Sequence, residues 1–193
     1  MSRPKEFDPE TALDKAMQVF WLNGYEATSL GDLIDTMGIS KSSFYDTFGS
    51  KREIFLSSLD RYAATTLAGI VETLESDMPG RDAIARIFRN AAERFVRNED
   101  PQGCFISNAT AEMTAHCPQT RIKVNKLFHR IEDAFEKAVE RGQREGAISR
   151  RHDPRALARF LVTSLNGLQV VGMADPDSGP LSDTVETVLK TLG

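Results

Sequence analysis

Apolar residues recur at helical spacing along nearly the whole chain. Gly and Pro stand between the periodic runs, and no alternating apolar–polar stretch is long enough for a strand. This pattern predicts an all-α protein of about nine helices, with three short helices at the N-terminus and six in a larger helical bundle. We therefore expect two units, residues 1–50 and residues 51–193.

The three N-terminal helices are bounded by residues that are typical of helix ends. A polar residue or proline begins each helix, and glycine ends it. In chain order these residues are Asp8 with Pro9, Gly24, Thr28 or Ser29, Gly38, Ser40 and Gly49. The turn 37–40 joins the second and third helices, so residues 29–48 have the layout of a helix-turn-helix.

Six further helices are expected after residue 50. Pro118 and Pro154 stand where they can open a helix, and Gly146 where it can end one. The expected ranges are 50 to about 76, 80 to about 97, 104 to about 116, 118–146, 154 to about 173, and a last helix after the loop 174–180.

The composition is that of an ordinary globular protein, with 40% hydrophobic and 27% charged residues. No stretch approaches 18 consecutive apolar residues, and the first thirty positions carry charges throughout. We therefore expect no signal peptide, no membrane partner and a cytoplasmic location. The two cysteines have no CxxC spacing, which suits a reducing compartment.

The overall charge argues against a nucleic-acid partner, because the chain has a net charge of -4 and a pI near 5.5. Attraction to phosphate acts over only about 8 to 10 Å at ordinary salt, so the local charge decides. Residues 38–52 hold Lys41, Lys51 and Arg52 against a single acid, Asp46. The positive charge is therefore concentrated at the third helix.

The third helix is expected to have one apolar and one polar face. Phe44 and Phe48 lie one turn apart and should face the core. The remaining surface is short or polar and consists of Lys41, Ser42, Ser43, Tyr45, Asp46 and Thr47. Such a face can enter a major groove and bond to base edges and phosphates.

The segments GYEATSL at 24–30 and MGISKSSFYDTFGSK at 37–51 resemble the signature of the TetR/AcrR family of bacterial transcription regulators. The resemblance covers about residues 8–60. It implies an N-terminal tri-helical, homeodomain-like DNA-binding unit, a C-terminal bundle for effector binding and dimerisation, and double-stranded operator DNA as the partner. The implied contacts are Thr28 and Ser29 on phosphate, Lys41, Ser42, Ser43 and Thr47 in the groove, and Tyr45 and Lys51 on the DNA backbone.

Two positions leave the base contacts open. Gly31 stands where some members of the family carry a side chain that reaches a base, so one specific contact is missing here. Asp46 has two interpretations: its carboxylate accepts from a cytosine amino group, or it bonds locally to Ser42 or Ser43.

The resemblance further implies a homodimeric repressor that an unknown small-molecule effector releases from DNA. The last two helices are more apolar than one body can cover. The expected dimer interface is Phe160, Ser164, Leu168, Val171, Val185 and Leu189, with Gly167 and Gly172 allowing close approach. The other interpretation is that both helices only close the core of the single chain. The expected effector pocket is Tyr62, Phe88, Phe95, Phe105, Asn108, Met113 and Phe128, although a packed core is the default interpretation for any one of them. The helix from residue 50 would carry the movement between pocket and DNA.

A redox signal is an alternative to a small-molecule effector. Cys104 is expected at a helix N-terminus, where the helix dipole favours a thiolate, and an inert core residue is the other interpretation. Cys117 is either a resolving partner or has no role. A metal site made of Cys104, His116 and Cys117 lacks a recognised spacing, so we expect no metal and no other cofactor.

Other functional classes find little support in the sequence. There is no GxSxG, P-loop, GxGxxG or HExxH motif, and the three histidines have no evident nucleophile beside them, so we expect no enzyme. Two alternatives stay open: a transcriptional activator of the same family, and a helical ligand-binding or scaffold protein that never touches DNA.

Overall fold

The computed structural model describes residues 7–99 and 102–193, apart from the side chain of Ser178. The prediction of an all-helical chain is confirmed, because helices are the only regular elements in these two ranges. The N-terminal helices are α1 (Pro9–Asn23), α2 (Leu30–Met37) and α3 (Lys41–Phe48). The body contains α4 (Lys51–Tyr62), η1 (Ala63–Leu67), α5 (Ala68–Glu75), α6 (Gly80–Val96), α7 (Phe105–Met113), α8 (Pro118–Arg144), α9 (Pro154–Ala174) and α10 (Ser178–Lys190).

The helix expected from residue 50 to about 76 is present as one continuous helical rod with an irregularity at its middle. We call α4, η1 and α5 together the rod. Residues 63–67 form a π-helical turn, η1, between α4 and α5. No local pattern predicts this turn, because Ala-Ala-Thr-Thr-Leu continues the helical pattern without Gly or Pro. π-turns inside α-helices are rare, and those that do occur often lie at functional sites.

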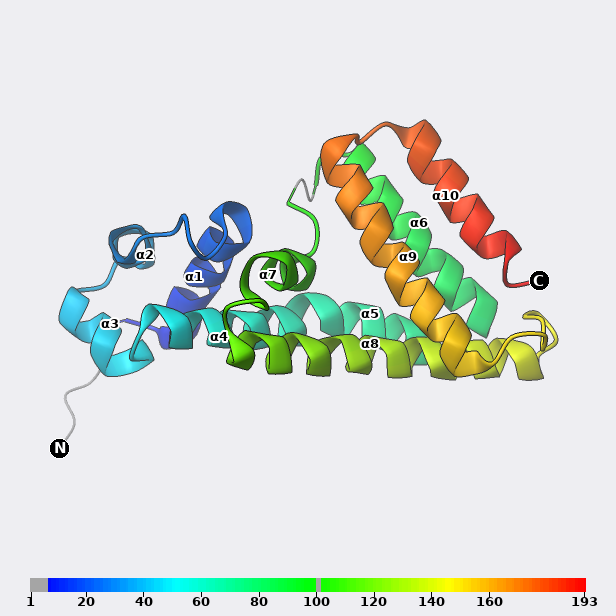
Figure 1. The fold of residues 1–193 in the computed structure, drawn as a ribbon, viewed down its shortest axis with the longest axis horizontal. Coiled ribbons are helices and arrows are strands. Elements are labelled where there is room, and N and C mark those ends of the chain that lie inside the picture. The colour runs from blue at the N-terminus through cyan, green and yellow to red at the C-terminus, as the bar shows by residue number, and fades with distance from the viewer. Residues whose placement is uncertain (1–6, 100–101) are drawn as a thin grey trace.

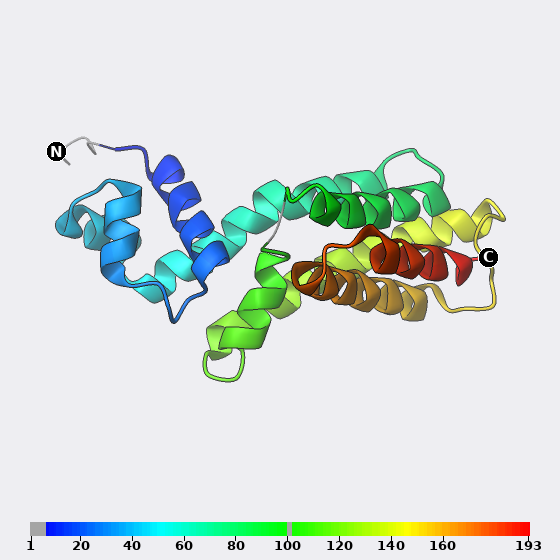
Figure 2. The ribbon, with the colours of Figure 1, turned by 90° about the horizontal axis from the view of Figure 1, so that it is seen from above.

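The helices form a small unit and a larger one, joined by this rod (Figure 1). α1, α2 and α3 gather at the N-terminal end, and α6, α9 and α10 stand together at the other end. The rod runs from the small unit into the body and lies beside α8, while α7 lies between the two units (Figures 1 and 2). The rod and α7 therefore both connect the small unit to the body.

The expected capping residues hold the N-terminal helices in place. The Asp8 carboxylate accepts from the backbone N–H groups of Glu10 and Thr11 at the start of α1. Ser29 and Asp32 form a reciprocal capping box at α2, with bonds of 3.1 and 2.8 Å. Gly38 ends α2 in the left-handed conformation that favours glycine.

The core of the small unit extends into α4. The Phe55 ring of α4 packs edge-on against Phe20 and Tyr25, with ring centroids 5.1 and 4.9 Å apart. Phe44 of α3 is completely buried, and Phe48 is half-buried against it. The expected boundary after residue 50 thus crosses a continuous aromatic core.

The body is closed by α9, whose inner face carries Leu161, Leu165 and Leu168 in buried positions. By length and composition α9 is also apolar enough to cross a membrane. Its inner face packs on α8 and α6 as a core helix does. An ion-pair network fixes its first turn, because Arg155 reaches Glu132, Asp133 and Glu136 of α8. Its outer face remains uncovered in the single chain.

Candidate nucleic-acid interface

The outer surface of α3 carries the residues expected in the groove. Lys41, Ser42 and Tyr45 are exposed, and Ser43 and Thr47 are half-buried. Because the opposite face is anchored by buried Phe44, these side chains lie away from the core of the small unit. The polar face of α3 is therefore open to a macromolecular partner.

Hydrogen bonds among three serines order the first turn of α3. The Ser40 hydroxyl accepts from the backbone N–H of Ser43 at 3.1 Å and lies 3.0 Å from the Ser42 hydroxyl and 2.9 Å from that of Ser43. Within the described residues, the Asp46 carboxylate accepts no hydrogen bond from the side chain of Ser42 or Ser43. The local interpretation of Asp46 is therefore wrong, and its carboxylate is exposed.

The expected phosphate contact through the Thr28 side chain is also wrong. Thr28 is 1% exposed, and its hydroxyl donates to the Gly24 carbonyl at 2.6 Å. The chain turns back here between α1 and α2, and Thr28 closes that turn. Ser29, the next residue, is exposed at the N-terminus of α2, where helix N–H groups and the helix dipole favour an anion.

Lys51 lies at the edge of the same surface. Its ammonium group stands 4.2 Å from the centroid of the Tyr25 ring, a cation–π contact that holds the long side chain in one place. Asp32 is close enough for the Lys51 charge to contribute to the low pKa of its carboxyl, after the hydrogen bonds from the Ser29 hydroxyl and backbone, which are the larger causes. Lys51 is thus positioned beside the N-terminus of α2.

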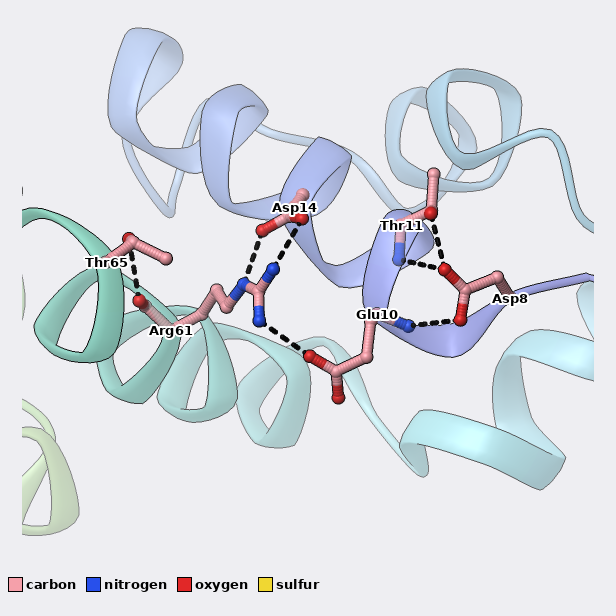
Figure 3. Close-up of polar contacts among 6 residues, drawn as sticks. All are labelled: Asp8, Glu10, Thr11, Asp14, Arg61 and Thr65. Carbon is pink, nitrogen blue, oxygen red and sulfur yellow. Dashed lines mark hydrogen bonds and ion pairs between the residues drawn. The ribbon is translucent and has the colours of Figure 1, made fainter.

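Arg61 ties the rod to α1 (Figure 3). Its guanidinium binds the Asp14 carboxylate through two nitrogens, at 2.5 and 2.8 Å, and Glu10 through the third, at 2.7 Å. The hydrogen bond to Asp14 is the main reason that the pKa of Arg61 lies above its usual value. A planar fork held by two carboxylates fixes direction as well as distance.

α7 ties the body to the loop before α2. The Glu112 carboxylate accepts from the backbone N–H groups of Tyr25 and Glu26, each at 2.8 Å. A side chain at residue 24 would obstruct this contact, since a Cβ on Gly24 would lie 3.0 Å from a Glu112 oxygen. Just before the N-terminus of α7, the Trp21 indole N–H donates to the Gly103 carbonyl at 3.1 Å. The last turn of α7 and the segment that leads into its first turn are therefore both bonded to the small unit.

A cavity of about 230 Å³ opens in the body between the rod, α6 and α9. Its lining mixes polar and apolar groups: Thr66, Gly69, Ile70, Thr73, Ile87, Asn90, Ala91, Arg94, Phe95, Gly103, Leu165 and Gln169. Thr66 belongs to the π-turn, and the carbonyl of Gly103 bonds to Trp21. The cavity thus touches two of the connections to the small unit.

This cavity differs from the expected effector pocket. Of the expected residues, Phe95 alone lines it. Tyr62 and Phe105 pack edge-on against each other in the core, with centroids 5.8 Å apart, and Phe88 packs on Phe135. Met113 is also buried in the core, Asn108 donates to the Gln102 carbonyl, and Phe128 packs on the core half-buried. The aromatic signal in the sequence marked the core, whereas the cavity is lined largely by small and polar residues.

The expected dimer residues divide into two groups. Phe160 and Val171 on the outer face of α9 are 43% and 51% exposed, and Ser164 is half-buried. Leu168, Val185 and Leu189 are buried within the chain itself, so their expected place at the surface is wrong. Gly172 likewise packs on the Phe95 ring of the same chain, whereas Gly167 is exposed. The apolar surface left open belongs to α9.

Both cysteines are buried and unpaired. Cys104 stands at the N-cap of α7, as expected, and Cys117 at the N-cap of α8. In the described ranges no group of three or more His, Cys, Asp and Glu side chains is arranged to hold a metal ion.

Sequence reasoning missed the residues that join the two units. Arg61, Glu112 and Trp21 bond across 47 to 87 positions of the chain, and no local pattern reports such a separation. One weak signal existed: Glu112 is the only charged residue in α7, a helix that is otherwise apolar or neutral.

Comparison with known proteins agrees with this architecture. Residues 12–57 match the family described as bacterial regulatory proteins, tetR family, and residues 80–188 match the tetracyclin repressor-like C-terminal domain. The chain is 34% identical to the helix-turn-helix transcriptional regulator YezE of Bacillus subtilis (strain 168) over 193 residues, the full length of both. It is 31% identical to the repressor ComR of Escherichia coli (strain K12), covering 87% of this chain and 80% of that one. Among solved structures, a CifR cysteine mutant complexed with 26-bp operator DNA is 30% identical, with a TM-score of 0.87 and full coverage of both chains.

Proposed function

Because the chain belongs to the TetR family of bacterial regulatory proteins, we propose that it is a transcriptional repressor that binds operator DNA as a homodimer. The observation that carries the proposal is the exposed polar face of α3, held outward by buried Phe44. Lys41, Ser42, Ser43 and Thr47 would enter the major groove, and Tyr45, Lys51 and Ser29 would contact the DNA backbone. A role on bacterial operator DNA implies a cytoplasmic location.

A homodimer would place two copies of α3 in successive turns of the groove, roughly 34 Å apart. The outer face of α9 supports this proposal, because Phe160, Val170 and Val171 lie exposed around Gly167. Residues 160, 163, 167 and 171 recur at helical spacing and form one stripe. Two such stripes can pack together, with Gly167 allowing the helix axes to approach.

The cavity between the rod, α6 and α9 is the proposed effector site. Its mixed lining suits a small molecule with both apolar and polar groups. Thr66 places the cavity against the π-turn of the rod, so that a ligand preferring another geometry of this turn would shift the rod and the spacing of the recognition helices. A redox signal at Cys104 is the alternative trigger.

The proposal is tested by selecting tightly bound duplexes from a random DNA pool and titrating the selected duplex at several salt concentrations. Binding should weaken steeply with salt. Lys41→Ala or Lys51→Ala should each lower the slope of log Kd against log salt by about 1, because each removes one phosphate contact. Lys126→Ala, an exposed change on α8, is the matched control and should leave the slope unchanged.

Failure to select any duplex, or a slope insensitive to Lys41 and Lys51, would contradict DNA binding through this face. Repression and activation use the same DNA-binding surface, so binding alone does not separate them. Transcription from the selected site in a reconstituted system does.

A further inference from the structure

We propose that Cys117 is an oxidation site at which a small peroxide modifies the joint between the body and the DNA-binding unit. The effect on DNA rests on the proposed function, whereas the chemistry at the sulfur does not. The site consists of Cys117 with Thr120 and Gln119 on the first turn of α8, and Arg52 on the first turn of α4.

The buried and unpartnered hydroxyl of Thr120 points to an anion at this site. Thr120 is completely buried, and its oxygen has no hydrogen-bond partner within the described residues. A buried donor without an acceptor is costly. The sulfur of Cys117 is the group beside it, and a thiolate would be the acceptor that this hydroxyl lacks. The geometry of the first turn thus favours the charged form of the cysteine.

The electrostatics agree with this geometry. Burial works to raise the pKa of the Cys117 thiol, but the Thr120 hydroxyl, the backbone N–H groups of Thr120 and Gln119 and the charge of Arg52 outweigh it. The resulting pKa lies below the ordinary value of a cysteine. Because the thiolate is the nucleophile, this cysteine reacts faster than a buried cysteine without such donors.

Access to the sulfur is through an exposed side chain. Cys117 is 3% exposed, and its thiol donates to the side-chain oxygen of Gln119 at 3.5 Å. Gln119 is itself exposed, so the sulfur is bonded to a side chain at the protein surface, and a rotation of that side chain would release the thiol. Because the sulfur is so nearly buried, we expect a molecule as small as hydrogen peroxide to reach it more readily than a bulky reagent.

The reaction is a two-electron oxidation. The thiolate sulfur attacks one oxygen of hydrogen peroxide, the S–O bond forms, and the O–O bond breaks. The sulfur becomes a sulfenic acid, and the other oxygen leaves as hydroxide, which takes up a proton to give water. Cys104 does not act as the resolving thiol within the chain, because the nine residues of α7 separate the two cysteines. These residues span about 13 Å, whereas a disulfide requires Cα atoms within about 7 Å.

An added oxygen on this sulfur would reach the small unit through α7. The Cys117 backbone N–H donates to the Met113 carbonyl at 2.8 Å, and Met113 follows Glu112. Glu112 holds the backbone of Tyr25 and Glu26 just before α2. Cys117 and Met113, the two ends of this turn, are buried in the core. An oxygen added to the buried sulfur would have to displace its neighbours, and we expect this shift to move the turn 113–117 and loosen the hold of Glu112 on the loop before α2.

The chemistry is tested on the full-length protein with hydrogen peroxide at pH 7, quenched into denaturant with dimedone and analysed by peptide mass spectrometry. Cys117 should be trapped as the sulfenic acid faster than Cys104. Thr120→Val should slow this reaction about tenfold, because it removes a hydrogen bond to a charged group, while Thr120→Ser should retain the rate. Arg52→Gln, a surface change that does not disturb the core, should slow it about twofold.

Equal rates in the wild type, Thr120→Val and Arg52→Gln would overturn the proposal, as would faster reaction of Cys104 or a Cys104–Cys117 disulfide. The functional arm compares binding of the selected duplex before and after peroxide. Wild type and Cys104→Ser should lose affinity, and Cys117→Ser should not; the reverse pattern would assign the signal to Cys104. If the untreated protein binds no duplex, the proposed function fails, while the measured oxidation rates still decide the chemistry.

Discussion

Replacing Glu112 by Gln tests whether α7 positions the DNA-binding unit. The carboxylate accepts one backbone N–H with each oxygen, whereas the amide offers one acceptor and turns an NH2 group towards the other N–H. A hydrogen bond to a charged group contributes about 1.5 to 3 kcal/mol, and the lower figure applies because this contact is partly exposed to water. We therefore expect a loss of about 1.5 kcal/mol in the closed state of the loop.

A loss of this size raises the population of the open loop about tenfold. Amide hydrogen exchange measures that population directly at Tyr25 and Glu26, whose protection should fall by about the same factor. Affinity for the selected duplex should fall by up to tenfold, because Ser29 and α2 follow this loop. The residues around the cavity should keep their exchange rates, since Glu112 is not among the residues that line it.

The matched control is Glu93→Gln. Glu93 pairs with Arg97 at 3.2 Å on the surface of α6, so the charge change is the same and the contact is local. It should leave the exchange of Tyr25 and Glu26 unaltered. Unchanged protection at these two amides in Glu112→Gln, or an equal effect of Glu93→Gln, would refute the positioning role of Glu112.

Two further predictions concern the dimer and the cavity wall. Phe160→Glu should give a monomer in sedimentation analysis and weaken duplex binding, because it places a charge on the apolar face of α9. The control Val96→Glu, at a residue 49% exposed on α6, should stay dimeric. A dimeric Phe160→Glu would exclude this face of α9 as the interface. Gly103→Ala should lower the free energy of unfolding by about 1 kcal/mol or more, since φ of Gly103 is +65° and the added Cβ would lie 2.6 Å from the Met173 sulfur. Gly69→Ala, in a helix with open space around it, should raise stability by about 0.5 to 1 kcal/mol, and the same sign for both would contradict this reasoning.

The sequence by itself determined the α-helices, apart from the π-turn in the fourth, and the family. Caps such as Asp8, Ser29 and Gly38 act within three or four residues, so their effect is visible in the linear pattern. The two-residue anchor of α3 was likewise correct, because the spacing of Phe44 and Phe48 places them on one face whatever else the chain does.

Only the tertiary structure decided which apolar residues are covered and which polar groups meet. Leu168 and Phe160 are both apolar residues of α9. Leu168 is buried by the chain's own helices, whereas Phe160 is exposed. Thr28 and Ser29 are both good caps, but the turn of the chain buries the first. Burial and long-range hydrogen bonds depend on the relative placement of whole helices, which periodicity does not encode. The Glu112 contact and the π-turn were therefore visible only once the helices were assembled.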